Sequence, residues 1–136
     1  MSDLQHAAAC MRFFDDELNS DRITDRLGVA PTNRWRKGEL WSDHGVGKLR
    51  QSAGWILDCD WTTGDDLNDQ VEKTFSRMTS DMLIWRDITD ACSADMFCGL
   101  FPVEKRGLAT LAPHTLEMIS QRGLDLVLEI YNPSGS

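Results

Sequence analysis

The sequence predicts an α+β protein with a single, mainly antiparallel sheet of four to five strands and about three helices packed on one face. Segments in which every second residue is apolar are interleaved with segments whose apolar residues recur every three or four positions, which indicates strands and amphipathic helices in one chain. A segment with apolar residues on both faces, 96–101, predicts a strand in the interior of that sheet.

The first 30 residues predict a strand and a short helix. Over residues 7–14 alternate side chains fall on opposite faces of a strand: Ala9, Met11 and Phe13 on one face, and Cys10, Arg12 and Phe14 on the other. Ser20 is a suitable N-cap for a helix over about residues 21–27, and Gly28 supplies its C-terminal stop.

The middle of the chain predicts a long loop between regular elements. Residues 34–54 are polar and rich in glycine, so we expect a loop of the kind that often carries function, with a short strand around residues 39–43. Residues 55–59 then predict a strand, and residues 66–78 predict an amphipathic helix.

The second half of the chain predicts further elements. The apolar run 81–85 fits either a buried strand or the tail of a helix, because periodicity does not separate the two. Pro113 fits the first turn of a helix over about 113–121, with Leu116 and Ile119 facing inward. A final strand over 124–131 has one apolar face: Leu124, Leu126, Leu128 and Ile130.

Length and composition place these elements in one small acidic domain. The 136 residues fit a single domain, 1–136, with a core over about 7–131 and a tail over 132–136. No run approaches the roughly 18 apolar residues that span a bilayer, and the N-terminus lacks the basic start of a signal peptide, so we expect a cytoplasmic protein with no membrane partner.

Charge is distributed unevenly along the chain. Residues 22–50 hold seven cations and three acids, a net charge of +4, which leaves −12 for the remainder of a chain of net charge −8. A bipolar molecule can steer and orient a charged partner. The acidic excess disfavours nucleic acid, because it repels phosphate groups at long range.

The cysteines and histidines give weak signals for chemistry. Four cysteines without close Cys-x-x-Cys spacing predict reduced thiols packed as small apolar residues, so we expect no metal ion and no cofactor. The best available nucleophilic set is Cys98 with His114 and Asp95, but Cys98 lies in an apolar run that tends to raise the pKa of a thiol. The sequence therefore predicts no catalytic residues.

Tryptophan and arginine gather in the middle of the chain and form the candidate binding surface. Five tryptophans in 136 residues is a high count, and Trp85 is assigned to the core. Trp and Arg are the residue types enriched at binding hot spots. The candidate binding residues are Arg34, Trp35, Arg36, Lys37, Trp41, Trp55 and Trp61. The alternative is that Trp55 and Trp35 pack beneath the loop, with Arg34 or Arg36 stacked on them.

Taken together, several segments resemble the bacterial DUF4279 family, a domain of unknown function. The resemblance covers roughly residues 12–131. The combination of segments is specific, whereas each alone is weak. The matching segments are Phe13-Phe14-Asp15-Asp16 and 23–32, Trp35-Arg36-Lys37-Gly38, Gly54-Trp55-Ile56-Leu57, Phe97-Cys98-Gly99-Leu100-Phe101, Arg106-Gly107-Leu108, 116–123 and 126–131. The chain departs from the family at Asp58-Cys59-Asp60-Trp61, where members often have a longer acidic and polar continuation. The resemblance implies a small intracellular domain and no particular activity.

Three functional hypotheses follow. The first is a non-enzymatic protein that binds a protein partner in the manner of an inhibitor or immunity protein, its acidic majority facing a basic toxin or effector. The second is a small-molecule sensor that holds an anionic ligand with Arg34, Arg36 and Lys37 against Trp35 and Trp55. The third is a thiol enzyme that uses Cys98 and His114.

Overall fold

The computed structural model describes residues 4–59, 66–102 and 108–131. Its strands are β1 (Leu4–Asp15), β2 (Asn33–Trp35), β3 (Leu40–Asp43), β4 (Val46–Leu49), β5 (Ala53–Asp58), β6 (Ser93–Pro102) and β7 (Asp125–Ile130). Its helices are α1 (Ser20–Leu27), α2 (Leu67–Ser76), α3 (Met82–Ala91) and α4 (Pro113–Gln121). The predicted α+β class is confirmed.

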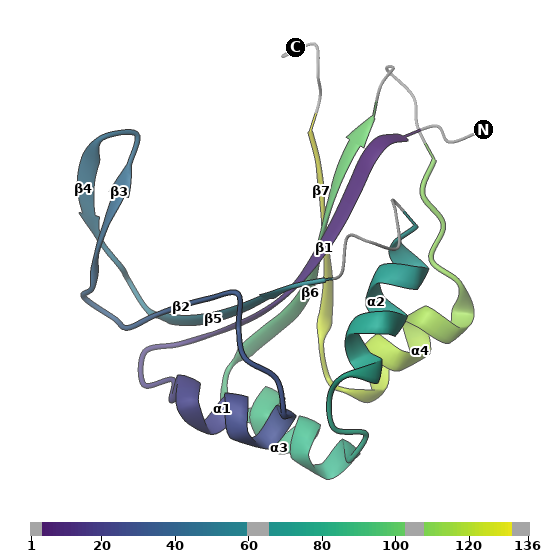
Figure 1. Cartoon of the computed structure of the whole chain (residues 1–136), viewed down its shortest axis with the longest axis horizontal. Helices are drawn as coiled ribbons and strands as arrows, with labels where there is room; N and C mark the ends of the chain where they lie inside the picture. The colour runs from purple at the N-terminus through teal and green to yellow at the C-terminus, as the bar shows by residue number, and fades with distance from the viewer. Residues whose placement is uncertain (1–3, 60–65, 103–107, 132–136) are drawn as a thin grey trace.

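A five-stranded sheet runs in the order β2-β5-β1-β6-β7. Its neighbours pair antiparallel except for β6 and β7, which are parallel, so the sheet is mixed but mostly antiparallel. The strand predicted to lie in the interior is β6, which is paired on both sides, as predicted. Strands β3 and β4 form a separate hairpin, which rises from the β2–β5 end of the sheet on the side away from the helices (Figure 1).

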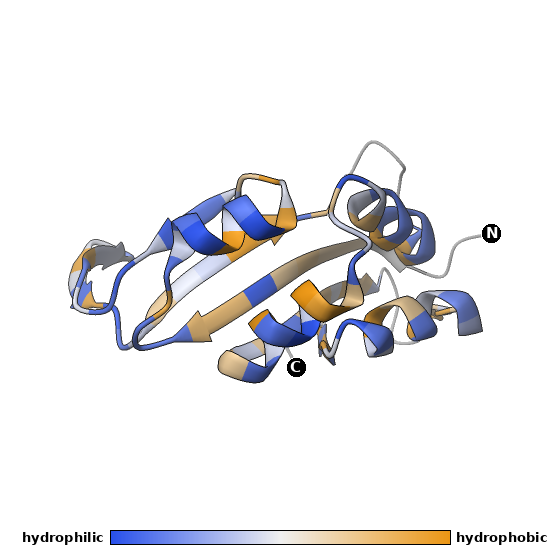
Figure 2. Cartoon of the chain, turned by 90° about the horizontal axis from the view of Figure 1, so that it is seen from below, coloured by the Kyte–Doolittle hydropathy of each residue, from blue (hydrophilic) through white to orange (hydrophobic). Residues whose placement is uncertain are grey.

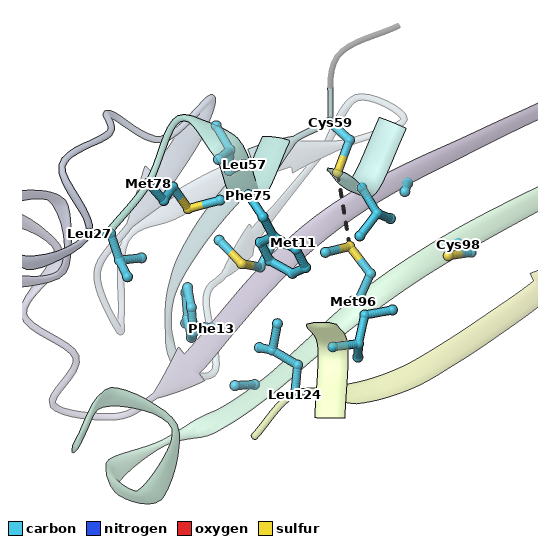
Figure 3. Close-up of a cluster of buried hydrophobic side chains, with 14 of the residues drawn as sticks. Met11, Phe13, Leu27, Leu57, Cys59, Phe75, Met78, Met96, Cys98 and Leu124 are labelled. Atoms are coloured by element: carbon cyan, nitrogen blue, oxygen red, sulfur yellow. Dashed lines mark hydrogen bonds between the residues drawn. The ribbon is translucent and has the colours of Figure 1, made fainter. Parts of the chain in front are cut away.

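All four helices lie on one face of this sheet. Figure 2 shows them in two rows, with α1 beside α3 and α2 beside α4. Strand alternation explains the packing, because β1 sends every second side chain into the helix layer. These side chains are at most 2% exposed: Ala7, Ala9, Met11 and Phe13. In the core that they form, the thiol of Cys59 donates to Sδ of Met96 at 3.9 Å (Figure 3).

Gln70 of α2 completes the hydrogen bonding of β1 where β5 ends. The register between β1 and β5 stops at Cys10 and Asp58. The buried Gln70 side chain accepts a hydrogen bond from the backbone N–H of Ala9 at 2.9 Å and donates one to the backbone oxygen of Ala7 at 2.8 Å. Since an unpaired buried backbone group is costly, this side chain anchors α2 to the sheet.

The helix ends follow the predicted signals with one correction. Gly28 ends α1 with φ 81°, in the left-handed region that favours glycine, and Pro113 opens α4 as expected. The N-cap of α1 is Asn19 rather than Ser20, because the Asn19 side-chain oxygen accepts a hydrogen bond from the N–H of Arg22 at 3.1 Å. None of the described helices has both the length and the apolarity to cross a membrane.

The predicted long loop over 34–54 is wrong. This segment forms the end of β2, the β3–β4 hairpin and the start of β5, and the short strand expected around 39–43 is β3. The hairpin closes with a two-residue turn, His44 and Gly45, and both have positive φ, as tight hairpin turns require. The glycines of this segment indicated a loop, whereas one of them, Gly45, lies in the turn of the hairpin.

Three details of the second half of the chain were open or differ from expectation. The run 81–85 begins α3, which Asp81 caps, with Trp85 buried in the core as predicted. In α4, Ile119 is buried as predicted but Leu116 is exposed. The apolar face of β7 is buried only at its start, and its far end is exposed because the helix layer does not extend over it: Leu124 and Leu126 are covered, Leu128 and Ile130 are not.

Candidate functional site

The sheet face opposite the helices carries no helix of the described chain, and we call it the open face. Because side chains alternate between the two faces of a strand, every second residue of each strand lies on the open face. The strand registers place these residues next to one another across the sheet. Residues on this face include Cys10, Arg12, Phe14, Trp35, Ile56, Asp95 and Phe97. Most of these side chains are half-buried rather than fully exposed. The placement of Arg12 and Phe14 on the face opposite Met11 and Phe13 confirms the prediction for β1.

Aromatic rings and guanidinium groups form a row along this face that continues into the hairpin. We call the row the aromatic–arginine ladder: Trp41, Arg50, Trp35, Phe14, Arg12 and Phe97. The Arg50 guanidinium lies 4.4 Å from the Trp41 ring centre and 3.9 Å from that of Trp35. The rings of Trp35 and Phe14 are 6.2 Å apart. The Arg12 guanidinium lies 5.3 Å from Phe14 and 4.3 Å from Phe97. Each contact is within the range of a cation–π or aromatic pair.

Arg12 has a carboxylate partner within the chain. Its Nε and one terminal nitrogen donate to the two oxygens of Asp95 at 2.8 and 2.9 Å, which is a bidentate pair. The hydrogen bond to Asp95 raises the pKa of Arg12, so the guanidinium stays charged. The pair joins two neighbouring strands, β1 and β6, and holds this end of the ladder in place.

Arg50 is held by its backbone at the base of the hairpin. Its N–H donates to the backbone oxygen of Glu39 at 2.9 Å, and its carbonyl accepts from the N–H of Gly38 at 2.8 Å. Its half-buried side chain lies between the two indole rings. Among the described residues no carboxylate lies within ion-pair distance of it.

Trp35 is fixed against the sheet. A Cβ added to Gly54 would lie 2.3 Å from the Trp35 ring, so the indole rests directly on the backbone of β5. The indole N–H donates to the backbone oxygen of Ser52 at 3.0 Å. Since the ring is held on one side and at its N–H, it presents a preformed surface toward Arg50.

A cavity of about 560 Å³ lies between the hairpin and the open face. Phe14 and Trp35 line it from the sheet, and Trp41, Lys48 and Arg50 line it from the hairpin. The hairpin also carries large apolar side chains that are exposed: Leu40, Val46 and Leu49. Leu40 and Leu49 are paired across the hairpin, and paired exposed leucines of this kind are typical of an interaction site.

The tryptophans of the candidate site are divided by the structure. Trp35 and Trp41 lie together on the ladder. Trp55 is wrong as a binding residue, because its side chain is fully buried in the helix layer. Its ring packs 5.3 Å from that of Phe13, and its N–H donates to the Thr24 hydroxyl at 3.1 Å. Trp61 lies outside the described residues.

The predicted cations do not form a cluster around Trp35. Arg34 is paired across the sheet with the buried Trp55, so it faces the helix side and binds Asp21 of α1. Lys37 binds Asp16 at 2.9 Å, and Arg36 is exposed. Arg34, Trp35 and Arg36 do line one cavity together, of about 680 Å³, but Glu17, Asp21 and Glu39 line it too, and Asp21 pairs with Arg34. The stacking predicted for Arg34 or Arg36 is supplied by Arg50 instead.

Four ladder residues were therefore missing from the predicted site: Arg50, Phe14, Arg12 and Phe97. A signal for Arg50 was present in Gly45. A two-residue turn that ends at this glycine sets the register in which Trp41 pairs with Lys48. In that register Arg50, two residues after Lys48, lies at the base of the hairpin close to Trp41. Reading the segment as a loop hid that register.

The nucleophilic set does not assemble. Cys98 is paired with Ala9 of β1 and is buried on the helix face, whereas Asp95, three residues earlier in the same strand, lies on the open face. His114 is exposed at the start of α4. Burial raises the pKa of Cys98 to about 12, so little thiolate forms near neutral pH.

Fold and site together define an α+β domain with helices on one sheet face and an aromatic, arginine-bearing surface on the other. A family model described as "Domain of unknown function (DUF4279)" matches residues 5–133, and the chain belongs to this family. Searches of curated proteins and of solved structures found no match.

Proposed function

We propose that this protein is a non-enzymatic binding domain that holds a protein partner against the open face and the hairpin, in the manner of an inhibitor or immunity protein. The observation that carries the proposal is the aromatic–arginine ladder, which no helix of the described chain covers. Trp and Arg supply large contact area and directional donors, and they dominate the binding energy of many interfaces.

The preformed geometry of the ladder supports a binding role. Trp35 is held by the backbone of Gly54 and by its hydrogen bond to Ser52, and Arg12 is held by Asp95. Side chains that are already ordered lose little conformational entropy when a partner binds, so more of the contact energy appears as affinity.

The hairpin favours a macromolecule over a small ligand. Leu40 and Leu49 are paired across the hairpin, on the side that does not carry Trp41. Both are exposed. A small ligand in the cavity beside Trp41 would leave Leu40 in water, whereas a protein surface can cover both sides of the hairpin. The small-anion site built on Arg34, Arg36, Lys37, Trp35 and Trp55 loses support for two reasons. Trp55 is buried and Lys37 pairs with Asp16, and the cavity that Arg34, Trp35 and Arg36 line together is also lined by the acids Glu17, Asp21 and Glu39.

Charge favours a basic partner such as a toxin or effector. The net charge of −8 attracts a positively charged protein at long range and accelerates encounter, while the ladder sets the final contact. The absence of a catalytic role is part of the proposal. Its support is the raised pKa of Cys98 and the separation of that thiol from Asp95.

Affinity capture with matched variants tests the proposal. The immobilised wild-type protein, Leu49→Ser and Leu83→Ser are incubated with lysate of the organism that encodes the chain. Leu49 lies on the hairpin and Leu83 on α3, and both are exposed leucines, so the two changes are chemically matched.

The expected result is one stoichiometric partner that the wild type and Leu83→Ser recover equally. Purified partner should then bind Trp41→Ala at least about tenfold more weakly than wild type, as for an interface hot spot. Recovery of no stoichiometric partner, or equal affinity for Trp41→Ala and wild type, would contradict the proposal.

A further inference from the structure

The open face carries two arginines in similar surroundings, and only one has its counter-ion. Arg12 lies between the rings of Phe14 and Phe97 and pairs with both oxygens of Asp95. Arg50 lies between Trp35 and Trp41. In the described part of the chain it has no carboxylate partner. Both arginines therefore lie between two aromatic rings, but only Arg12 also has a carboxylate among the described residues.

The stacking at Arg50 determines which group can complete it. The Arg50 guanidinium carbon lies over both indole rings, and none of its N–H donors has a carboxylate partner in the described chain, so these donors remain available to a ligand. A planar fork of N–H donors matches the two oxygens of a carboxylate, and such bidentate pairs are shorter and stronger than neutral hydrogen bonds. Stacking also fixes the plane of the guanidinium before a partner arrives, which lowers the entropy lost on pairing.

The cavity around Arg50 is lined by no described acid, and Arg50 itself has no ion-pair partner in the described chain. Its described lining residues are Phe14, Trp35, Trp41, Lys48, Leu49, Arg50, Gln51 and Ser52. In a chain of net charge −8, this is a local site for a negative group. Its aromatic walls lower the competition from water and strengthen an ion pair inside it.

We infer that Arg50 is the receptor for an aspartate or glutamate side chain of the protein partner, which completes between Trp35 and Trp41 the pair that Asp95 makes with Arg12. This inference rests on the proposed function and names the anchor of that interface. A basic partner drawn by the overall charge presents one acidic side chain at this point, which fixes the register of the complex.

Peptide selection followed by a double-mutant cycle tests the inference. Random dodecapeptides displayed on phage are selected on the folded wild-type protein. The best peptide is then synthesised with each acidic residue either kept or changed to its amide. Binding is measured through tryptophan fluorescence to the wild type, Arg50→Ala, Arg50→Lys and Arg86→Ala. Arg86 is an exposed arginine on α3, in the helix layer, and controls for the loss of one positive charge.

The inference predicts selected peptides that share an acidic position. Arg50→Ala should weaken binding about tenfold or more, which corresponds to about 1.4 kcal/mol. Arg50→Lys should restore only part of it, because an ammonium group lacks the planar fork, and Arg86→Ala should bind like wild type. The amide peptide should lose no further affinity on Arg50→Ala, since the pair is already broken.

Two outcomes overturn the inference and are distinguishable from failure of the proposed function. If selected peptides bind at the ladder, as shown by loss of binding on Trp41→Ala, but contain no shared acid or ignore Arg50→Ala, the carboxylate anchor is wrong and the binding face stands. If free sodium glutamate binds as tightly as the peptide, the site serves a small acid. If no peptide depends on Trp41, both proposals fail.

Discussion

Gly54→Ala should displace Trp35 and break the ladder at its centre. The added Cβ would lie 2.3 Å from one ring carbon of Trp35 and 2.4 Å from another. Carbon atoms in contact are normally about 3.5–4.0 Å apart, so the ring must move by roughly 1 Å or more. That movement lengthens the 3.0 Å hydrogen bond from the Trp35 indole to Ser52. It also withdraws the ring from the Arg50 guanidinium, which in the wild type lies 3.9 Å from the ring centre.

The magnitude of the loss follows from these contacts. Overpacking costs about 1–3 kcal/mol, and the lost hydrogen bond adds about 1 kcal/mol. The lower entropy of the unfolded alanine chain offsets about 0.5–1 kcal/mol. We therefore expect the free energy of unfolding to fall by about 1–3 kcal/mol, and Tm by roughly 3–12 °C for a chain of this size.

Urea and thermal unfolding, followed by circular dichroism, measure this change, and tryptophan emission reports the ring. Gly47→Ala is the matched control, because its added Cβ would meet only Cδ1 of Leu40, at 3.6 Å, which is ordinary contact. We expect the control to unfold like wild type. Equal stability and unchanged emission for Gly54→Ala would refute the packing of Trp35 on β5.

Three further predictions concern groups around the sheet. In urea unfolding, Arg12→Ala should cost about 3 kcal/mol, because it leaves the Asp95 carboxylate, only 11% exposed, without its partner. Asp95→Ala should cost about 1.5–2 kcal/mol, because the Arg12 side chain that it leaves unpaired is 27% exposed. The reverse order of the two losses would contradict this account of the pair. Gln70→Leu leaves two backbone groups of β1 without their partner and should cost about 2–5 kcal/mol, whereas a loss below about 1 kcal/mol would show that water replaces the side chain. Burial raises the pKa of Cys10 and Cys98 from 9.0 to about 12. Above pH 9 the thiols of the unfolded chain therefore lose their protons before those of the folded chain, and the free energy of unfolding should fall as pH rises from 9 toward 12. A constant free energy of unfolding over that range, or rapid modification of the native thiols at pH 8, would contradict this prediction.

The faces of β1 were predictable from the sequence, and the identity of the site residues was only partly so. Alternation correctly separated Met11 and Phe13 from Arg12 and Phe14, and the structure shows that the first pair faces the core. Trp35 lies between two arginines and Trp55 between Gly54 and Ile56, and neither local pattern shows which face of the sheet the ring takes. Only the register with β1, which pairs Trp55 with Phe13, decides that Trp55 is the core residue.

The contacts of the ladder depend on pairings that the sequence does not display. Arg12 and Asp95 are 83 residues apart, and their contact follows from the placement of β6 beside β1. Arg50 reaches Trp41 through the hairpin register, which a glycine-based loop prediction overlooked. Local patterns identified most elements, whereas tertiary pairing decided which cation stacks on which ring.

Footprinting of the complex by hydroxyl radicals, read by mass spectrometry, tests most directly whether the aromatic–arginine ladder is the binding face. The partner recovered by affinity capture is added to the wild-type protein, and oxidation of individual side chains is compared with and without it. The account predicts strong protection of Trp41 and Leu49, with Leu83 on α3 oxidised at an unchanged rate. Protection of Leu83 while Trp41 stays as reactive as in the free protein would contradict it.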